Sequence, residues 1–336
     1  MNALHPGLDL PDHARMPLGL VPLDTASPTG NLNDEHTEQS VELAARLDAA
    51  AVIDPTMVMI LSTDTNNLRL LDRRLGGLAI ADKMRAQISQ IERAYTHVVR
   101  PGLRSSLARL LAEASSLAGW QNINTLALND AWNHYERSKT AAAEADNPSV
   151  FAYVSGEQAY VLMELGRPAE ATELLQHIRA TFSDRVPARL RAWLSAAEAE
   201  AAAVLGDEST CRRALDVATR LLPDGDFDMD LPYVSLNAHH LARWRGNCLV
   251  HFGDLTVAED LRSAIAGMDG TYNRAESVAR CDLGHVLLAA GDPEAAQPHI
   301  YRAQQLATMT GTRRQRRRID ELTTAVNRAL GLQASP

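Results

Sequence analysis

The feature that most constrains this chain is a glycine that recurs after apolar, alanine-rich segments. It occurs five times, at separations of 47, 40, 47 and 38 residues, in LAGWQN (Gly119), LGRPAEA (Gly166), LGDESTC (Gly206), FGDLTVA (Gly253) and AGDPEAA (Gly291). Glycine ends a helix at little cost because it adopts the left-handed conformation readily. An Asp or Pro close behind it can begin the next helix by capping its first turn or by fixing φ. The spacing therefore predicts a helical hairpin that is repeated along the chain.

Composition agrees with a fold built from helices. Hydrophobic residues make up 46% of the chain and aromatic residues only 4%, while alanine dominates many segments. This balance favours closely packed helices over a sheet sandwich, so we expect an all-α protein. A length of 336 residues allows two ordinary domains or one elongated array, whose length is not limited by a single core.

Four parts are expected from proline content and periodicity. Residues 1–33 contain five prolines and three glycines, which predicts a disordered tail or linker. Apolar residues begin to recur at helical spacing at about Asp34, and we interpret residues 34–102 as a helical lead-in. The repeat array is expected over residues 103–330, followed by a tail at residues 331–336.

The last repeated unit has the spacing of a known motif. Its small and apolar residues stand where the tetratricopeptide repeat has them: Leu283, Gly284, Leu287, Gly291, Ala296 and Ala303. Small Gly284 and Ala296 would let the two helices of a hairpin approach closely, and Leu287 would fill the space between them. The four earlier units keep fewer of these positions. We therefore expect a tetratricopeptide-like α-solenoid of about five helical hairpins.

The order of several segments resembles a known family. LLDRRLGG, VVRPGL, LAEASSLAGW, LGRPAEA, LSAAEAEAAAVLGD, RGNCLVHFGD and LLAAGDPEAA follow one another as in the C-terminal repeat half of actinobacterial helix-turn-helix (XRE-type) transcriptional regulators. The resemblance covers about residues 68–330 and implies a sensory or dimerising module. The compact DNA-binding domain of that family has no counterpart before residue 68, so the resemblance implies action through a partner chain.

A solenoid of hairpins has a concave inner face that is lined by the first helix of each pair. The residues expected on this face are Tyr153, Glu157, Tyr160, Trp193, Glu200, His240, Arg243, Trp244, Asn247, His251, Asp282 and His285. Aromatic side chains beside hydrogen-bonding ones suit a pocket that anchors an apolar group and orients a polar one. The alternative, that Trp193 and Trp244 only pack between hairpins, stays open.

Three further clusters each have a structural explanation beside a functional one. The five arginines Arg313, Arg314, Arg316, Arg317 and Arg318 could bind phosphate groups or an acidic partner, or they could form the polar face of a helix above Ile319, Leu322 and Val326. The loop PDGDFDMDLP contains Asp224, Asp226, Asp228 and Asp230 but lacks the glycine and glutamate of a calcium loop, so we interpret it as a solvated linker. The histidines lack metal-ligand spacing, and no metal site is expected.

Charge and cysteine content argue against several functional classes. The formal net charge of −9 lacks the basic footprint of an autonomous nucleic-acid binder. Cys211, Cys248 and Cys281 show no disulfide or zinc spacing, so each is expected to act as a small buried hydrophobe. The N-terminus lacks the pattern of a signal peptide, and no apolar run reaches the roughly 20 residues of a membrane span. A cytoplasmic protein without membrane contact is therefore expected.

Three functional hypotheses follow. The first is a non-enzymatic regulatory module, without a cofactor, that binds a peptide, small molecule or protein in its groove, with a homodimer as a possible assembly. The second is an enzyme or pathway accessory protein, for which His240, His251, His285, Glu157 and Glu200 are the acid–base candidates. The third is a DNA-associated regulator that uses the cluster from Arg313 to Arg318, although the acidic net charge makes direct nucleic-acid binding the less favoured expectation.

Overall fold

The computed structural model describes residues 32–225, 230–268 and 270–332, and all regular structure in these ranges is helical. The expectation of an all-α protein is confirmed for this part of the chain. The proline-rich stretch lies outside the described residues as far as residue 31, and so do residues 333–336 of the C-terminal tail. None of the described helices has the length and apolar content that would let it cross a membrane.

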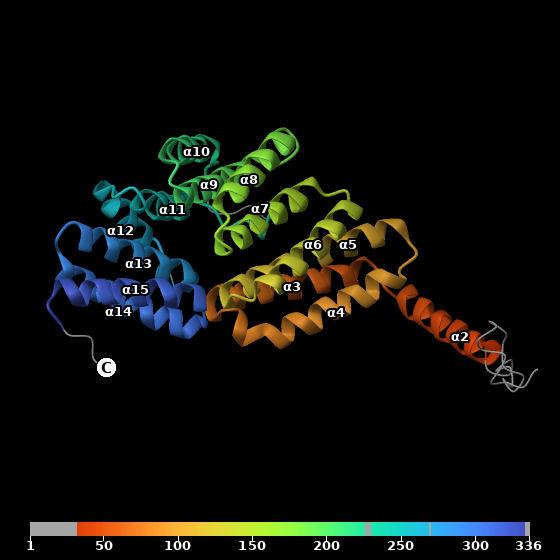
Figure 1. Ribbon diagram of the computed structural model, residues 1–336. Coiled ribbons are helices and arrows are strands. Elements are labelled where there is room, and N and C mark those ends of the chain that lie inside the picture. The colour runs from red at the N-terminus through yellow and green to blue at the C-terminus, as the bar shows by residue number, and fades with distance from the viewer. Residues whose placement is uncertain (1–31, 226–229, 269, 333–336) are drawn as a thin grey trace, which may run out of the picture. The chain divides into compact units, whose positions relative to one another are not determined.

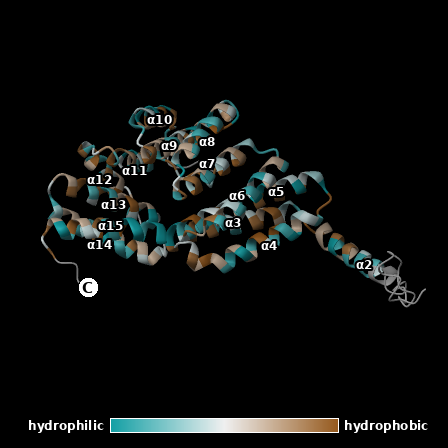
Figure 2. Ribbon diagram, in the orientation of Figure 1, coloured by the Kyte–Doolittle hydropathy of each residue, from teal (hydrophilic) through white to brown (hydrophobic). Residues whose placement is uncertain are grey.

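The chain forms two compact units, residues 1–52 and residues 53–336. The described part of the first unit is α2 (Leu32–Ala51), in which the apolar residues Val41, Leu43 and Leu47 are exposed. Figure 2 shows hydrophobic residues alternating with hydrophilic ones along this helix. The second unit begins with α3 (Pro55–Leu75), a short 3-10 turn (Gly77–Ile80) and α4 (Ala81–His97). The boundary between the two units thus falls inside the segment 34–102 that we interpreted as one helical lead-in. Within the second unit, α3 and α4 pack on the helix that follows them.

The remaining helices of the second unit are α5 (Pro101–Thr125), α6 (Leu128–Glu144), α7 (Pro148–Glu164), α8 (Pro168–Phe182), α9 (Ala188–Leu205), α10 (Glu208–Leu221), α11 (Ala238–Val250), α12 (Ala258–Ala266), α13 (Asn273–Ala289), α14 (Pro293–Thr310) and α15 (Arg313–Ala329) (Figure 1). A 3-10 turn (Leu255–Val257) precedes α12. Buried alanines allow the close packing that the composition indicated, and in α9 Ala196, Ala197 and Ala199 are fully buried.

Four of the five glycines end a helical segment as the sequence predicts. Gly166, Gly206, Gly253 and Gly291 all have left-handed backbone, with φ between 70 and 84°. The next helix then begins with a capping residue or a proline. For example, the side chain of Asp207 accepts a hydrogen bond from the backbone N–H of Thr210, and Pro168 opens α8.

The predicted helix break at Gly119 is wrong. Gly119 lies inside α5, which continues to Thr125, and the left-handed residue that ends the helix is Leu126, with φ of 63°. A Cβ atom on Gly119 would lie 2.8 Å from Cε1 of Tyr135 on α6, so this glycine allows the close approach of two helices. With the turn placed at Leu126, the first three turns, at Leu126, Gly166 and Gly206, stand 40 residues apart.

Packing between helices follows a regular order in the second unit. Each helix from α3 onward contacts the next one along the chain, and successive odd-numbered helices from α3 to α15 also contact one another. The two ends of this series meet, because α15 contacts α5 while α13 and α14 contact α3. Figure 1 shows the blue helices α13 and α15 beside the orange α3. The odd-numbered helices therefore follow one another in a closed series around one inner face.

Candidate functional site

A cavity of about 210 Å³ lies on this inner face, or about 1250 Å³ when the space continuous with solvent is included. It is lined by Arg69, Asp72 and Arg73 of α3, Glu113, Ser116, Leu117, Trp120 and Asn124 of α5, Tyr153, Glu157 and Tyr160 of α7, Trp193 and Glu200 of α9, His240, Arg243, Trp244 and Asn247 of α11, Arg274, Ala275 and Val278 of α13, Arg314, Gln315 and Arg318 of α15, and Tyr233, Ser235 and Tyr272 of the connecting segments. Among the described residues, no even-numbered helix contributes to this lining. The alternation of helices along the chain thus determines which residues reach the cavity.

Aromatic residues are concentrated in this cavity. Three of the four tryptophans and four of the seven tyrosines of the chain line it. The ring centroids of Tyr153 and Trp193 lie 4.7 Å apart, and those of Tyr153 and Tyr233 lie 4.8 Å apart. Trp193 meets Trp244 edge to face at 6.4 Å, and both indoles are only 6% exposed. These tryptophans therefore pack between hairpins and also form one wall of the cavity.

Glu157 is a buried carboxyl group in contact with Tyr153 of this wall. The hydroxyl groups of Tyr153 and Ser116 both donate hydrogen bonds to it, the former at 2.7 Å. Burial raises its pKa from 4.5 to about 7, and the two hydroxyl donors oppose this shift only in part. At neutral pH the carboxyl group is therefore protonated in a large fraction of molecules.

Glu200 is a second carboxyl group of the lining, on α9. Its carboxylate accepts a hydrogen bond at 2.7 Å from the indole nitrogen of Trp244 and another at 3.0 Å from the hydroxyl of Tyr160. The guanidinium of Arg314 lies 3.9 Å away. Neutral donors from two neighbouring helices thus fix this side chain.

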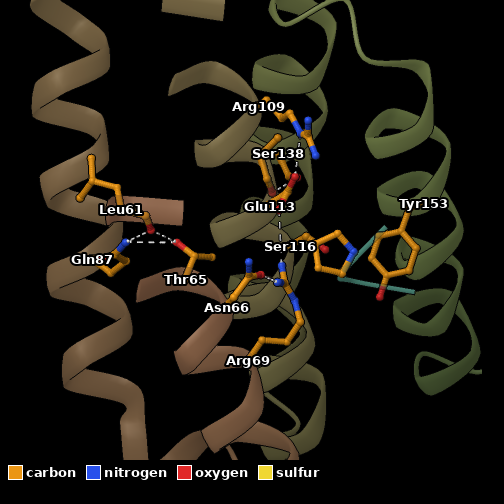
Figure 3. Close-up of polar contacts among 12 residues, drawn as sticks. Leu61, Thr65, Asn66, Arg69, Gln87, Arg109, Glu113, Ser116, Ser138 and Tyr153 are labelled. Atoms are coloured by element: carbon orange, nitrogen blue, oxygen red, sulfur yellow. Dashed lines mark hydrogen bonds and ion pairs between the residues drawn. The ribbon is translucent and has the colours of Figure 1, made fainter. Parts of the chain in front are cut away.

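Arg69 brings a positive charge to the cavity lining. Its guanidinium donates to the side chain of Asn66 and lies 3.7 Å from the carboxylate of Glu113, which Arg109 also contacts (Figure 3). The Arg69 side chain is 7% exposed, and its Nη2 atom has no hydrogen-bond partner. A buried polar atom of this kind is costly unless a partner reaches it.

Other ion pairs join the two ends of the helical series. Arg274 of α13 pairs with Asp72 of α3, and Arg314 of α15 donates to Glu164 of α7 at 2.5 Å. Arg318 of α15 pairs at 2.6 Å with Asp282, a fully buried carboxylate of α13. Asn247 donates to the same carboxylate at 2.9 Å. These contacts lie at and behind the cavity wall, so closure of the series and assembly of the site depend on the same residues.

Nine of the twelve residues expected on the inner face line the cavity: Tyr153, Glu157, Tyr160, Trp193, Glu200, His240, Arg243, Trp244 and Asn247. Asp282 lies directly behind the lining through its contacts with Arg318 and Asn247. His285, whose pKa burial lowers, and His251 lie near Asp282 but do not line the cavity. His240 is fixed by the side chain of Asn237, which accepts from its backbone N–H at 2.9 Å.

Sequence reasoning missed the contributions of α3, α5 and the connecting segments. Arg69, Asp72 and Arg73 belong to a segment that was expected as a lead-in outside the array. Trp120 lies close to Gly119, where a turn was expected. The available signal for α3 was the spacing of Arg69, Asp72 and Arg73, which places these three side chains on one face of a helix.

The C-terminal arginine cluster divides between two environments. Arg313, Arg316 and Arg317 are exposed, whereas Arg314 and Arg318 face the cavity and form ion pairs with Glu164 and Asp282. The apolar residues expected beneath the helix, Ile319, Leu322 and Val326, are buried.

The remaining expected clusters can be placed only in part. In the aspartate-rich loop, Asp224 and Asp230 are exposed, and Asp226 and Asp228 lie outside the described residues. Within the described ranges, no group of three His, Cys, Asp or Glu side chains is placed to hold a metal ion. Cys211, Cys248 and Cys281 are free and buried in helices, as predicted.

Comparison with known proteins gives no assignment, because neither a protein-family model nor a curated protein matches the chain.

Proposed function

We propose that this chain is a regulatory binding module, a tetratricopeptide-like array whose inner cavity takes up a small molecule. The observation that carries the proposal is the convergence of seven odd-numbered helices on one cavity that holds most of the tryptophans and tyrosines of the chain. Aromatic walls with a few well-placed polar groups are typical of small-molecule sites.

The enclosed geometry favours a small molecule over the peptide and protein partners that the sequence also allowed. A folded partner would need an open concave face, but α15 contacts α5 while α13 contacts α3. A cavity of about 210 Å³ with space toward solvent suits a compact ligand. The proposal therefore replaces the open groove with a pocket inside the array.

Binding would act through the contacts that close the array. Arg274, Arg314 and Arg318 each line the cavity and each pair with a carboxylate of another helix. A ligand that touches these arginines would favour one arrangement of the junction between the ends of the series. The resemblance to the repeat half of XRE-type regulators supports a role in transcriptional or biosynthetic regulation, exercised through a partner chain.

The test is native mass spectrometry of the full chain with a small-molecule extract of its source organism. We expect a retained compound that also raises the melting temperature. Ala275→Phe places a bulky ring in the cavity and should abolish retention, whereas Ala289→Phe on the exposed end of the same helix should not. Equal retention by the two variants, or none by the unaltered chain, would overturn the proposal.

One observation favours an enzyme as the second candidate. Glu157 lies in the cavity with a pKa of about 7, which is suited to a general acid or base. The same mass spectra separate the two functions. A binding module returns the compound unchanged, whereas an enzyme releases one of altered mass.

A further inference from the structure

We infer that the ligand of this cavity is a small organic anion with a flat aromatic body, whose acidic group is a carboxylate or phosphate held beside Arg73 and Arg243. The inference rests on the proposed function, since it names the class of molecule that the same cavity would bind. It is carried by the different partners of the six arginines in the lining.

Four of these arginines already have a carboxylate partner: Arg69 with Glu113, Arg274 with Asp72, Arg314 with Glu164 and Arg318 with Asp282. Arg73 and Arg243 are different, because no carboxylate of the described ranges lies within 4.0 Å of either. A half-buried guanidinium without a counterion gains free energy when an anion reaches it. The two arginines are thus the cations that a ligand can use without breaking an existing pair.

The protein contacts of these two arginines leave donors for a ligand. Arg73 donates to the backbone carbonyl of Pro232 at 3.1 Å, and its guanidinium lies 5.5 Å from the ring centroid of Tyr272. The guanidinium of Arg243 lies 4.8 Å from the ring of Trp244, and its buried Nε has no hydrogen-bond partner. Stacking holds both planar groups in place without using their N–H donors.

Ring contacts connect Arg73 with the helix that carries Arg243. The ring of Tyr272, on which Arg73 lies, is 4.7 Å from the ring of His240. His240 and Arg243 stand three residues apart on α11 and therefore share a helix face. The acidic group of the ligand is expected beside these residues.

Glu157 and Glu200 do not call for a cationic ligand. Both oxygens of Glu157 are engaged by hydroxyl donors, and Glu200 accepts from Trp244 and Tyr160. Burial raises the pKa of Glu157 to about 7, which reduces its negative charge near neutral pH. An ammonium group would therefore find both oxygens of Glu157 occupied, and it would meet Glu200 beside the positive charge of Arg314.

The remaining lining residues indicate the shape and the polar substituents of the rest of the ligand. Tyr153, Trp193 and Trp244 form a continuous aromatic wall, on which a flat ring can stack or pack edge to face. Two buried acceptors lack a hydrogen-bond partner, Oδ1 of Asp72 and Oε1 of Gln315. A hydroxyl or amino substituent on the ring would satisfy them, so a substituted aromatic acid should bind more tightly than a bare one.

The test is calorimetric titration of the full chain with isosteric probes. Naphthylacetate, naphthylacetamide and naphthylethylamine share a ring but carry negative, neutral and positive charge, and naphthyl phosphate tests the second kind of acid. We expect the better of the two acids to bind at least about tenfold more tightly than the amide, and the amine to show no measurable binding.

Arg73→Gln and Arg243→Gln should each remove most of the preference for the acid. Arg316→Gln removes the same charge from an exposed site outside the cavity and should leave the preference unchanged. Arg243→Lys, which keeps the charge, should retain part of the preference and shows that loss in the Gln variant does not arise from misfolding.

The outcomes separate this inference from the proposed function. Equal binding of acid, amide and amine would overturn the inference and leave a binding cavity in place. If the chain binds none of the probes but retains a compound from the extract, the inference is also overturned and the binding cavity stays in place. If the extract compound is also absent, the proposed function fails together with the inference.

Discussion

Two neutral hydroxyl groups, those of Ser116 and Tyr153, hold the carboxyl group of Glu157 in a site that is 4% exposed. No arginine pairs with it within salt-bridge distance among the described residues, although Arg69 lowers its pKa from further away. Burial consequently outweighs the hydrogen bonds, and the protonated form is favoured up to a pKa of about 7. An ionisable group in this condition makes stability depend on pH.

The sign of that dependence follows from the raised pKa. Below about pH 4.5 the carboxyl group is protonated in both the folded and the unfolded chain, and burial carries no ionisation penalty. Between pH 4.5 and about 7 the unfolded chain ionises first, so the free energy of unfolding falls as pH rises. In Glu157→Gln this loss is absent. Between the lower and the upper end of that pH range, the free energy of unfolding of the variant should therefore rise by about 3 kcal/mol relative to that of the unaltered chain.

Urea denaturation at the two ends of the pH range measures this difference. Glu294→Gln, at an exposed site on α14, provides the control and should give the same difference from the unaltered chain at both pH values. A Glu157→Gln curve that runs parallel to that of the unaltered chain would show that the carboxyl group ionises normally in the folded protein.

Single residues also mark the limit of what the sequence could predict about the site. Tyr153, Trp193 and Trp244 could be found because helical periodicity gives the register of each first helix. Arg73 and Tyr272 could not, because their place in the cavity depends on contact between α3 and α13, which are far apart in the chain. Local patterns contain no information about such a closure.

At the scale of the helix, α5 shows why a glycine can mislead. A glycine ends a helix only where left-handed backbone is needed, and Gly119 instead provides space for the ring of Tyr135. The actual end, Leu126, adopts φ of 63° without being glycine, which costs about 1 kcal/mol. The existence and order of helices were predictable from period and punctuation, but a tertiary contact decided the place of this turn.

Substitutions at two glycines of α5 test that interpretation. Gly119→Ala gains helix propensity but places Cβ 2.8 Å from a fully buried tyrosine ring, which cannot move away easily. We expect a net loss of about 1–3 kcal/mol in the free energy of unfolding. A Cβ atom on Gly102 of the same helix would have no neighbour within 4 Å, so Gly102→Ala should raise the free energy of unfolding by about 0.5 kcal/mol. Thermal and urea unfolding of both variants would refute the packing role if Gly119→Ala were as stable as Gly102→Ala.

At the scale of the second unit, the contact between the ends of the helical series explains how helices that pair locally come to surround a cavity. Each hairpin is formed by residues close in sequence, whereas closure uses pairs such as Arg274 with Asp72, which are 202 residues apart. Glu164 at the end of α7 is central to this closure, because it accepts from Arg314 at 2.5 Å and from Arg317 at 3.3 Å. The side chains of Glu164 and Arg314 are 8% and 16% exposed, so solvent screens this contact only weakly, whereas Arg317 is exposed and contributes less.

Removal of this carboxylate should therefore loosen the closure without unfolding the hairpins. We expect Glu164→Gln to lower the free energy of unfolding by about 2 kcal/mol, since the charge-assisted hydrogen bond from the largely buried Arg314 is weakened. Hydrogen exchange should become faster at the start of α15 and the end of α7, and stay unchanged in α9 and α10. Glu208→Gln breaks a half-exposed pair with Arg212 on α10 and should change stability by less than about 0.5 kcal/mol. If exchange in Glu164→Gln rose evenly across all helices, or did not rise at the α7 and α15 ends, the ion pairs would not be what holds the two ends together.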